Sequence, residues 1–229
     1  DHIYGLPGLL ASIGLAGSSS GIELYGPAPL KSFIDACLYN SSSRLAYSLK
    51  FEKVEDYASS KKILFEDSQI EVKAAPLKHR IPSFAYRVNQ KTRPGRFNIA
   101  KAKSMKIPPG PVYAALQRGE EVLLNDGRTF SGKEFCGPAR PGLSVVYCTD
   151  TVYTESAIEI SKEADLLIHE ATYSYKETEM AYQRGHSTAS MAAQIAAKAN
   201  VKQLILTHFS PRYTPGNETS PNDLLNEAK

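Results

Sequence analysis

Three apolar stretches of this 229-residue chain each end in a residue that can bind a metal ion or transfer a proton. LSVVYCTD ends at Asp150, ADLLIHE ends at His169 and Glu170, and KQLILTH ends at His208. Each stretch has the length of a buried strand. In an α/β sheet the carboxyl ends of such strands commonly build a site at one edge. The pattern therefore predicts that these side chains meet at that edge.

The chemistry open to such side chains is metal-assisted hydrolysis. The chain has five histidines, and Asp1 precedes the first of them: His2, His79, His169, His186 and His208. A single histidine at a strand end is more often structural than a ligand, so the histidines alone leave both interpretations open. Imidazole and carboxylate groups without a thiolate suit a catalytic Zn²⁺ or Mn²⁺ pair better than a structural zinc. Asp150 can bridge two ions held roughly 3.5–4 Å apart, as in two-metal hydrolytic sites.

The segments around these residues alternate between predicted strands and helices. SAIEISKEA and STASMAAQIAAKAN are predicted helices between the three strands, an alternation typical of an α/β fold. Upstream, we expect strands in IELYGP, QIEVKAAPLKH and SFAYRV, and a helix in PLKSFIDACLYN. The second of these strands would end at His79.

Residues 91–142 differ in composition and are predicted to form an inserted arm. The segment is rich in Gly and Pro, shows little core pattern and contains LLNDGRTF, which is typical of a hairpin. Its first sixteen residues carry six basic side chains and no acid: Lys91, Arg93, Arg96, Lys101, Lys103 and Lys106. A solvated loop is the plain interpretation. The lack of compensating acids favours an anionic partner instead.

The net charge, the cysteines and the apolar runs argue against several classes of protein. The net charge of +3 is too small to predict a nucleic-acid partner by itself. The three cysteines have no CxxC spacing, which argues against a disulfide framework or a thiolate zinc site and fits a reducing compartment. No apolar run reaches the roughly 18 residues that span a bilayer, so we expect no membrane association.

A set of motifs runs through the chain in a fixed order: DHIYGLPGLL, PLKHRIPSFAYRV, YCTDT, LLIHEATY, GHSTA and LTHFSPRY. KIPPGPVYAALQRGEEV lies within residues 91–142. Together they resemble the ribonuclease Z family, the tRNA 3′-processing endonucleases of the metallo-β-lactamase superfamily, and the last phrase resembles that family's flexible arm. The resemblance covers essentially the whole chain. It implies a metallo-β-lactamase fold, an αββα sandwich of two mixed sheets flanked by helices, with a projecting arm.

The family's first motif is His-x-His-x-Asp-His, and the chain begins with the second half of it. We therefore expect a fragment, with residues 1–229 forming one metallo-β-lactamase-like domain that lacks its first strands and also a final strand. The resemblance implies two Zn²⁺ ions per subunit in the complete enzyme, with Mn²⁺ as an alternative. The implied metal ligands of this chain are Asp1, His2, His79, Asp150 and His208.

The resemblance also implies the catalytic roles. Asp1 would bind a metal and orient or deprotonate the nucleophile. His186 would protonate the leaving 3′ oxygen and Glu170 would hold it in register, a form of catalysis that typically contributes about 10²–10⁴-fold. His169 is expected to support the fold around the strand end.

Precursor tRNA is the implied substrate, and cleavage would remove its 3′ trailer and leave a 3′-hydroxyl on the tRNA. Arginine suits phosphate because its planar fork binds two oxygens. Lysines of the arm would bind the tRNA body by its shape. The candidate RNA-binding residues are Arg87, Arg212, Lys101, Lys103 and Lys106. We also expect a homodimer, located in the cytoplasm of a bacterium or in a plastid.

Two other functions are compatible with parts of the pattern. A hydrolase of the same fold acting on a small ester, lactone, sulfate or phosphodiester would share the metal ligands but would need no basic arm. An RNA-binding protein that had lost catalysis would need no metal ligands, yet this chain retains every one that its length includes. The arm together with the GHSTA motif therefore favours the endoribonuclease.

Overall fold

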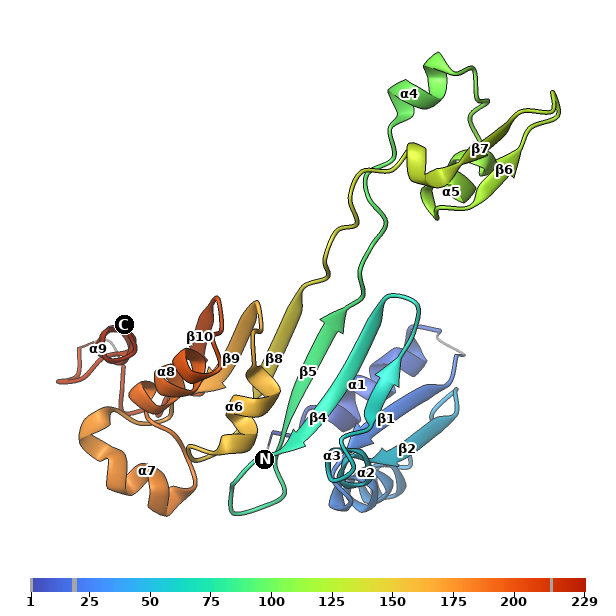
Figure 1. Ribbon diagram of the computed structural model, residues 1–229. Coiled ribbons are helices and arrows are strands. Elements are labelled where there is room, and N and C mark those ends of the chain that lie inside the picture. The colour runs from blue at the N-terminus through green and yellow to red at the C-terminus, as the bar shows by residue number, and fades with distance from the viewer. Residues whose placement is uncertain (1, 18–19, 215) are drawn as a thin grey trace. The chain divides into compact units, whose positions relative to one another are not determined.

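The structure is a computed structural model that describes residues 2–17, 20–214 and 216–229. The chain divides into two compact units, shown with their elements labelled in Figure 1. Unit 1 comprises residues 1–67, 71–88 and 144–229, and unit 2 comprises residues 68–70 and 89–143. The predicted insertion, residues 91–142, falls within unit 2.

A mixed sheet organises unit 1. Within the described part of the chain it has six strands, in the order β10-β9-β8-β5-β4-β3. Strand β8 pairs in parallel with β9, and β9 pairs in parallel with β10, so their carboxyl ends lie at the same edge. Strands β3 and β4 are antiparallel. The bounds are β3 Ile63–Glu66, β4 Ile70–Pro76, β5 Phe84–Gln90, β8 Ser144–Cys148, β9 Leu166–Glu170 and β10 Leu204–Thr207.

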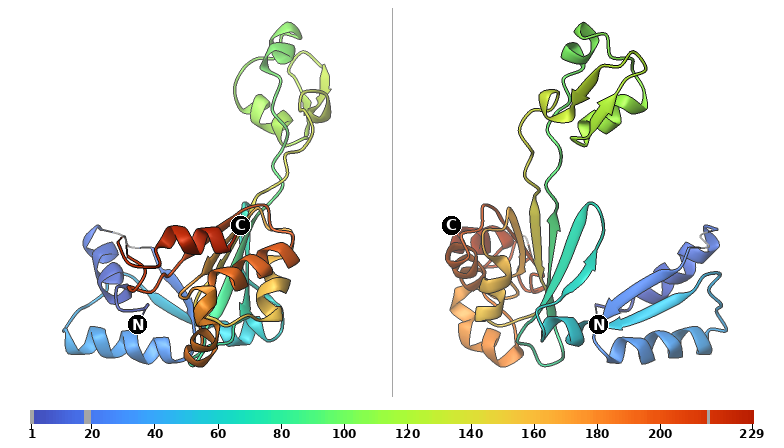
Figure 2. Two further views of the ribbon diagram at one scale, coloured as in Figure 1. Left: turned by 90° about the vertical axis from the view of Figure 1, so that its left-hand side faces the viewer. Right: turned by 45° about the vertical axis from the view of Figure 1, so that its right-hand side comes forward.

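Helices α6 (Glu155–Ser161) and α8 (Ala189–Lys198) cover one face of this sheet, as both views in Figure 2 show. Buried and exposed residues alternate along β8, as expected for a strand with one covered face. Val146, Leu167 and Ile195 are completely buried between the sheet and the helices. Each such side chain contributes roughly 1.5–3 kcal/mol by leaving water. The predicted strands and helices of this region are confirmed.

A second part of unit 1 is a parallel strand pair, β1 (Ile22–Gly26) with β2 (Leu49–Lys53). Helix α2 (Pro29–Asn40) connects the two strands, and α1 (Leu6–Leu15) packs against α2 (Figure 1). Proline at the start of α2 favours helix initiation because its φ angle is already helical. The predicted strand and helix are confirmed here also. The remaining helices of unit 1 are α3 Val54–Ala58, α7 Thr178–Arg184 and α9 Pro221–Glu227, with a 3₁₀ turn at Tyr175–Glu177.

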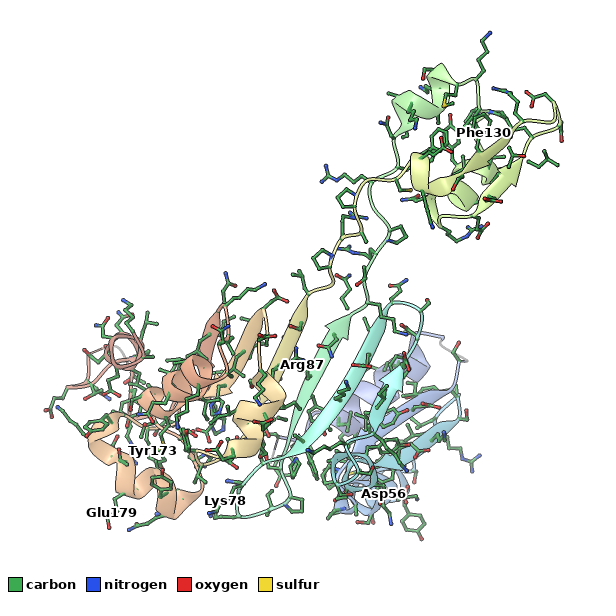
Figure 3. The ribbon with its side chains drawn as sticks, in the orientation of Figure 1. Asp56, Lys78, Arg87, Phe130, Tyr173 and Glu179 are labelled. Carbon is green, nitrogen blue, oxygen red and sulfur yellow. The ribbon has the colours of Figure 1, made fainter. Side chains whose placement is uncertain are left out.

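Unit 2 has a hydrophobic core of its own. Its elements are α4 Ile99–Ser104, α5 Pro111–Gln117, β6 Glu121–Leu123, β7 Thr129–Ser131 and a 3₁₀ turn at Gly132–Glu134. They bury a cluster formed by Ala102, Ile107, Leu116, Leu124, Phe130 and Phe135. Phe130 is labelled in Figure 3 among the side chains of this unit. The sequence of the segment shows little core pattern even though this core exists, because each short element supplies only one or two of its buried residues and no period develops.

The predicted hairpin in unit 2 is confirmed. Strands β6 and β7 pair antiparallel, and Gly127 occupies the turn with a φ of +83°, a conformation that favours glycine. Among the described residues, no helix is long and apolar enough to cross a membrane.

Candidate active site

The imidazole and carboxylate groups predicted to bind metal surround Asp150, two residues beyond the end of β8. Its Oδ2 lies 3.2 Å from His2 Nε2 and 3.9 Å from His79 Nε2. Its Oδ1 lies 3.6 Å from His208 Nε2. The structure thus brings together four of the five predicted ligands with Asp150 at the centre. The fifth, Asp1, lies outside the described residues.

The orientation of His79 is set by a backbone carbonyl. His79 lies in the loop between β4 and β5, and its Nδ1 is 2.7 Å from the carbonyl oxygen of Gly185. Because a carbonyl can only accept, Nδ1 carries a proton, which leaves Nε2, the nitrogen that faces Asp150, as the one that could bind a metal ion. Gly185 caps α7 with a φ of +81°, and a Cβ there would lie 2.7 Å from His79 Nδ1. Glycine is therefore required for both the turn and the close approach.

The loop that carries Asp150 is held by hydrogen bonds from several directions. Ser83 Oγ donates to the Asp150 carbonyl over 2.8 Å and also lies 2.8 Å from Thr149 Oγ1. The Lys78 amide donates to Thr151 Oγ1 over 3.1 Å, and Ser187 Oγ donates to the Thr151 carbonyl over 2.6 Å. Lys78 is labelled in Figure 3 at this end of the sheet. The two threonine hydroxyls are thus engaged in supporting the turn.

Glu170 and His186 form a pair beside this cluster. His186 Nδ1 donates to Glu170 Oε1 over 2.9 Å, and Glu170 is almost completely buried. The Thr151 and Thr172 amides also donate to this carboxylate. Burial disfavours the charged imidazolium of His186, but the hydrogen bond to Glu170 and the charges of Glu170 and Asp150 outweigh it and raise the pKa of His186. A raised pKa favours the protonated form that a general acid needs.

The ligand cluster and His186 open onto one cavity of about 380 Å³ in unit 1. It is lined by His2, His79, Arg80, Ile81, Asp150, His186 and His208. Arg80 was not among the residues predicted from the sequence, although it directly follows His79 in the PLKHR motif. Its guanidinium brings a positive charge to a cavity whose other charged groups favour metal ions, and it suits a phosphate group.

His169 takes no part in the cavity. Its side chain is completely buried, and its Nδ1 donates to the Glu170 carbonyl over 2.7 Å. Its Nε2 has no hydrogen-bond partner among the described residues. Burial lowers the pKa of His169, although Glu170 opposes the shift. This environment fits a neutral structural histidine, in keeping with the expectation that His169 supports the fold.

The predicted RNA-binding arginines have partners within the protein. Arg87 donates to the carbonyls of Ile160 and Lys162 at the end of α6, over 3.0 and 2.6 Å (Figure 3). Arg212 bonds to Glu177 and lies 5.3 Å from the centre of the Tyr173 ring. Neither residue lines the cavity. RNA binding by Arg87 and Arg212 stays a prediction. In the structure both side chains make contacts that stabilise the fold.

The predicted RNA-binding lysines of unit 2 differ from one another. Lys101 donates to the Glu134 carbonyl over 2.8 Å and lies 4.9 Å from the centre of the Phe135 ring. Lys103 and Lys106 are exposed. Contact with RNA stays a prediction for all three, and the two exposed lysines are better placed for it.

Comparison with known proteins assigns this chain to a family. Residues 123–209 match a family model described as a β-lactamase superfamily domain. A protein named ribonuclease Z from Prochlorococcus marinus strain NATL2A is 86% identical over all 229 residues, which cover 73% of that protein. The chain belongs to the ribonuclease Z family.

Solved structures agree with this ribonuclease Z assignment. The short form of human tRNase Z is 29% identical, with a TM-score of 0.60, and the match covers 92% of this chain and 68% of that one. YhfI of Bacillus subtilis, a metallo-β-lactamase-fold protein, is 18% identical with a TM-score of 0.58, covering 100% of this chain and 66% of that one. The predicted metallo-β-lactamase fold is confirmed.

The donor atoms around this cavity fit divalent metal ions. Among the described residues, three groups place one donor atom each within 4.8 Å of one another: His2, Asp150 and His208; His79, Asp150 and His186; and Glu170, His186 and His208. Asp150 belongs to the first two groups, which suits a carboxylate shared by two ions. Mixed nitrogen and oxygen donors without sulfur are typical of catalytic rather than structural zinc.

Proposed function

We propose that this protein cleaves the 3′ trailer from precursor tRNA and leaves a 3′-hydroxyl on the tRNA. As a member of the ribonuclease Z family, it is a hydrolytic endoribonuclease of tRNA 3′ processing. The observation that carries the proposal is the shared cavity, where the donors around Asp150 and the imidazole of His186 face the same space. A phosphodiester in that cavity would meet metal ions and a proton donor together.

We propose two Zn²⁺ ions as the resident metals, with Mn²⁺ as the alternative. His2, Asp150 and His208 would hold one ion together with Asp1. His79 and Asp150 would contribute to the other. When bound, divalent metal ions make a nucleophile available near neutral pH and offset the charge on the phosphate oxygens.

The chain's own residues perform the remaining steps. Arg80 would bind a non-bridging phosphate oxygen and fix the phosphodiester in the cavity. His186 holds Nδ1 against Glu170, so its Nε2 can carry the proton that passes to the 3′ oxygen as the P–O bond breaks. Glu170 stabilises the imidazolium before that transfer and fixes the ring. Asp1 would orient or deprotonate the water nucleophile.

The test is cleavage of a precursor tRNA with a 3′ trailer in the presence of Zn²⁺ or Mn²⁺. We expect one discrete cut that leaves a 3′-hydroxyl on the tRNA, and we expect Asp150→Asn to abolish it, because both ligand sets share this carboxylate. Hydrolysis of a small p-nitrophenyl phosphodiester without cleavage of the tRNA would favour the small-substrate hydrolase. Tight tRNA binding without any hydrolysis would favour the non-catalytic RNA-binding protein.

We further propose that exposed lysines of unit 2 bind the tRNA body and that the active protein is a homodimer. In such a dimer the basic segment of one subunit would serve the tRNA cleaved by the other. A monomer at micromolar concentration in light scattering would contradict this arrangement. We place the protein in the cytoplasm, and the cyanobacterial relatives favour a bacterial cell over a plastid.

A further inference from the structure

The hydroxyl of Thr172 lies between the metal-ligand cluster and the Glu170–His186 pair. Thr172 follows β9 and is 7% exposed. Its Oγ1 lies 2.7 Å from Glu170 Oε2 and 2.8 Å from His208 Nδ1. His186 Nδ1 lies 3.4 Å from the same oxygen. One small side chain therefore contacts a candidate metal ligand and both members of the proton-donating pair.

The chemistry of these groups fixes the direction of each hydrogen bond. Glu170 Oε2 already accepts from the Thr172 amide over 3.1 Å, so it also acts as acceptor toward the hydroxyl. A hydroxyl has a single proton, and Thr172 Oγ1 gives it to Glu170. The oxygen can then only accept from His208. It follows that His208 carries a proton on Nδ1, which leaves Nε2, the nitrogen that faces Asp150, as the one that could bind a metal ion.

The backbone around His208 and Thr172 also holds the contact between their side chains in place. His208 has a φ of +59°, a left-handed conformation that costs an L-residue energy and persists only where its surroundings hold it. The Thr172 carbonyl accepts from the Ser210 amide over 3.2 Å. Thr172 is thus bonded to the loop after β10 through its backbone as well as its side chain. Both bonds restrain the segment that carries His208.

We propose that Thr172 is a positioning residue that holds His208 in its metal-binding tautomer and couples this ligand to the Glu170–His186 pair. The inference deepens, and rests on, the proposed function. The chain of bonds runs from His208 Nδ1 through Thr172 Oγ1 to Glu170 and on to His186 Nδ1. A partner on the second ring nitrogen orients a ligating histidine and makes it more basic. The carboxylate that supports the proton donor therefore also supports a metal ligand.

The first measurement concerns the wild-type protein and needs neither RNA nor metal. Nitrogen-15 spectra of the histidine rings in the metal-free protein distinguish the Nδ1–H tautomer from the Nε2–H tautomer. We expect His208 to show the Nδ1–H form. The Nε2–H form at His208 would overturn the proposal, because its Nδ1 would then be an acceptor competing for the single Thr172 proton.

The second measurement is the affinity for Zn²⁺ alone, obtained by competition with a chromophoric chelator. Thr172→Val keeps the shape of the side chain and removes the hydroxyl, and we expect affinity to fall about 10–100-fold, as is typical when a partner of a metal ligand is lost. Thr172→Ser retains the hydroxyl and should restore most of the affinity. Thr154→Val is the matched control, because the hydroxyl of Thr154 bonds to Ser156 outside the cavity.

A purely structural role for Thr172 gives a different result. Thr172→Val would then lower the unfolding temperature of the metal-free protein while Zn²⁺ affinity and the His208 tautomer stayed as in the wild type, and the proposal would fail. Its failure is distinguishable from failure of the proposed function. A protein that binds Zn²⁺ in a Thr172-dependent way but does not cleave precursor tRNA would retain this inference and refute the substrate assignment.

Discussion

The buried side chains around the cavity of unit 1 and those inside unit 2 differ in kind. Around the cavity they include Thr151, Glu170, Thr172 and Ser187, and every one of them makes directed hydrogen bonds. Inside unit 2 the buried cluster is apolar and rich in aromatic contacts, with Phe130 and Phe135 packed edge to face. The structure around the cavity therefore depends on hydrogen-bond angles and proton positions. The core of unit 2 depends on side-chain volume and contact area.

This difference predicts two kinds of mutational effect. Removing one hydrogen-bonding group near the cavity leaves the apolar core of unit 1 intact. The rate of cleavage or the affinity for metal should therefore change more than the free energy of unfolding. Removing a large side chain inside unit 2 leaves the cavity residues untouched, so local folding and RNA binding should change and small-substrate chemistry should not.

The largest expected effect is at His186. His186→Asn removes the proton donor, and cleavage of precursor tRNA should fall by about 10²–10⁴-fold. A p-nitrophenyl phosphodiester has a leaving group that needs no proton, so its hydrolysis should change far less. The two rates, measured on one preparation, give the comparison. Equal losses on both substrates would mean that His186 supports the metal site instead.

In unit 2 the largest effect is expected from Phe135→Ala. Phe135 is 1% exposed and contacts Phe97 and Phe130, so truncation should cost about 3–5 kcal/mol of the local free energy of unfolding. We expect faster amide hydrogen exchange within residues 89–143 and weaker tRNA cleavage, with small-ester hydrolysis retained. Leu123→Ala is the control, because Leu123 is 69% exposed. A matching loss of small-ester hydrolysis would show that the cavity depends on the folding of unit 2.

Two glycines provide a matched pair across the two regions. Gly185→Ala would place a methyl group 2.7 Å from His79 Nδ1, whereas Gly119 has a similar φ of +85° and nothing within 4 Å of its would-be Cβ. Both substitutions carry the backbone cost of a left-handed alanine, about 1–2 kcal/mol. We expect Gly185→Ala alone to weaken Zn²⁺ binding, by about 10–100-fold. Equal Zn²⁺ affinities in both variants would mean that the His79–Gly185 contact does not matter.

The sequence predicted the framework of the site better than its hydrogen bonds. Strand-end positions placed Asp150 and His208 at one edge, because the strands were recognisable from short apolar runs. Thr172 and Gly185 were not singled out, although they stand in the LLIHEATY and GHSTA motifs. Their importance lies in which nitrogen of a neighbouring histidine they contact, and that is decided by tertiary packing.

The core of unit 2 escaped prediction for a related reason. Ala102 lies in α4, Leu116 lies in α5, and Phe135 follows the 3₁₀ turn at Gly132–Glu134, so these residues of the core are far apart in the sequence. No single window of residues shows a helical or strand period, so the sequence predicted an inserted arm but no core within it. The hairpin around Gly127 was predictable because its turn chemistry is local.

The buried His169 predicts how stability depends on pH. Burial lowers the pKa of His169 in the folded protein below the roughly 6.5 of an unfolded histidine. As pH falls below that value, the unfolded chain takes up a proton that the folded protein refuses, so stability present above about pH 6.5 is lost. His186 acts in the opposite direction, because its pKa is raised. The contribution of His169 must therefore be isolated by difference.

His169→Asn provides that difference. Urea unfolding at pH 7.5, 6.5 and 5.5 should show a steeper loss of stability for the wild type than for the variant, by at most about 1.4 kcal/mol per pH unit. The variant will itself be less stable at every pH, so the slopes and not the absolute values carry the test. Parallel pH dependences would mean that His169 does not resist protonation in the folded state.

The smallest expected effect lies on the surface of unit 2 and separates its lysines. Lys103 and Lys106 are exposed, whereas Lys101 is bonded to Glu134 and stacked on Phe135. If the exposed pair binds tRNA phosphates, Lys103→Gln with Lys106→Gln should lower the magnitude of the log–log salt slope of tRNA binding by about 1.4–1.8. Lys101→Gln should instead reduce the stability of unit 2 and leave the slope nearly unchanged. A larger slope change from Lys101→Gln than from the exposed pair would contradict this division of roles. It would show that Lys101 contacts phosphate as well as supporting the core of unit 2.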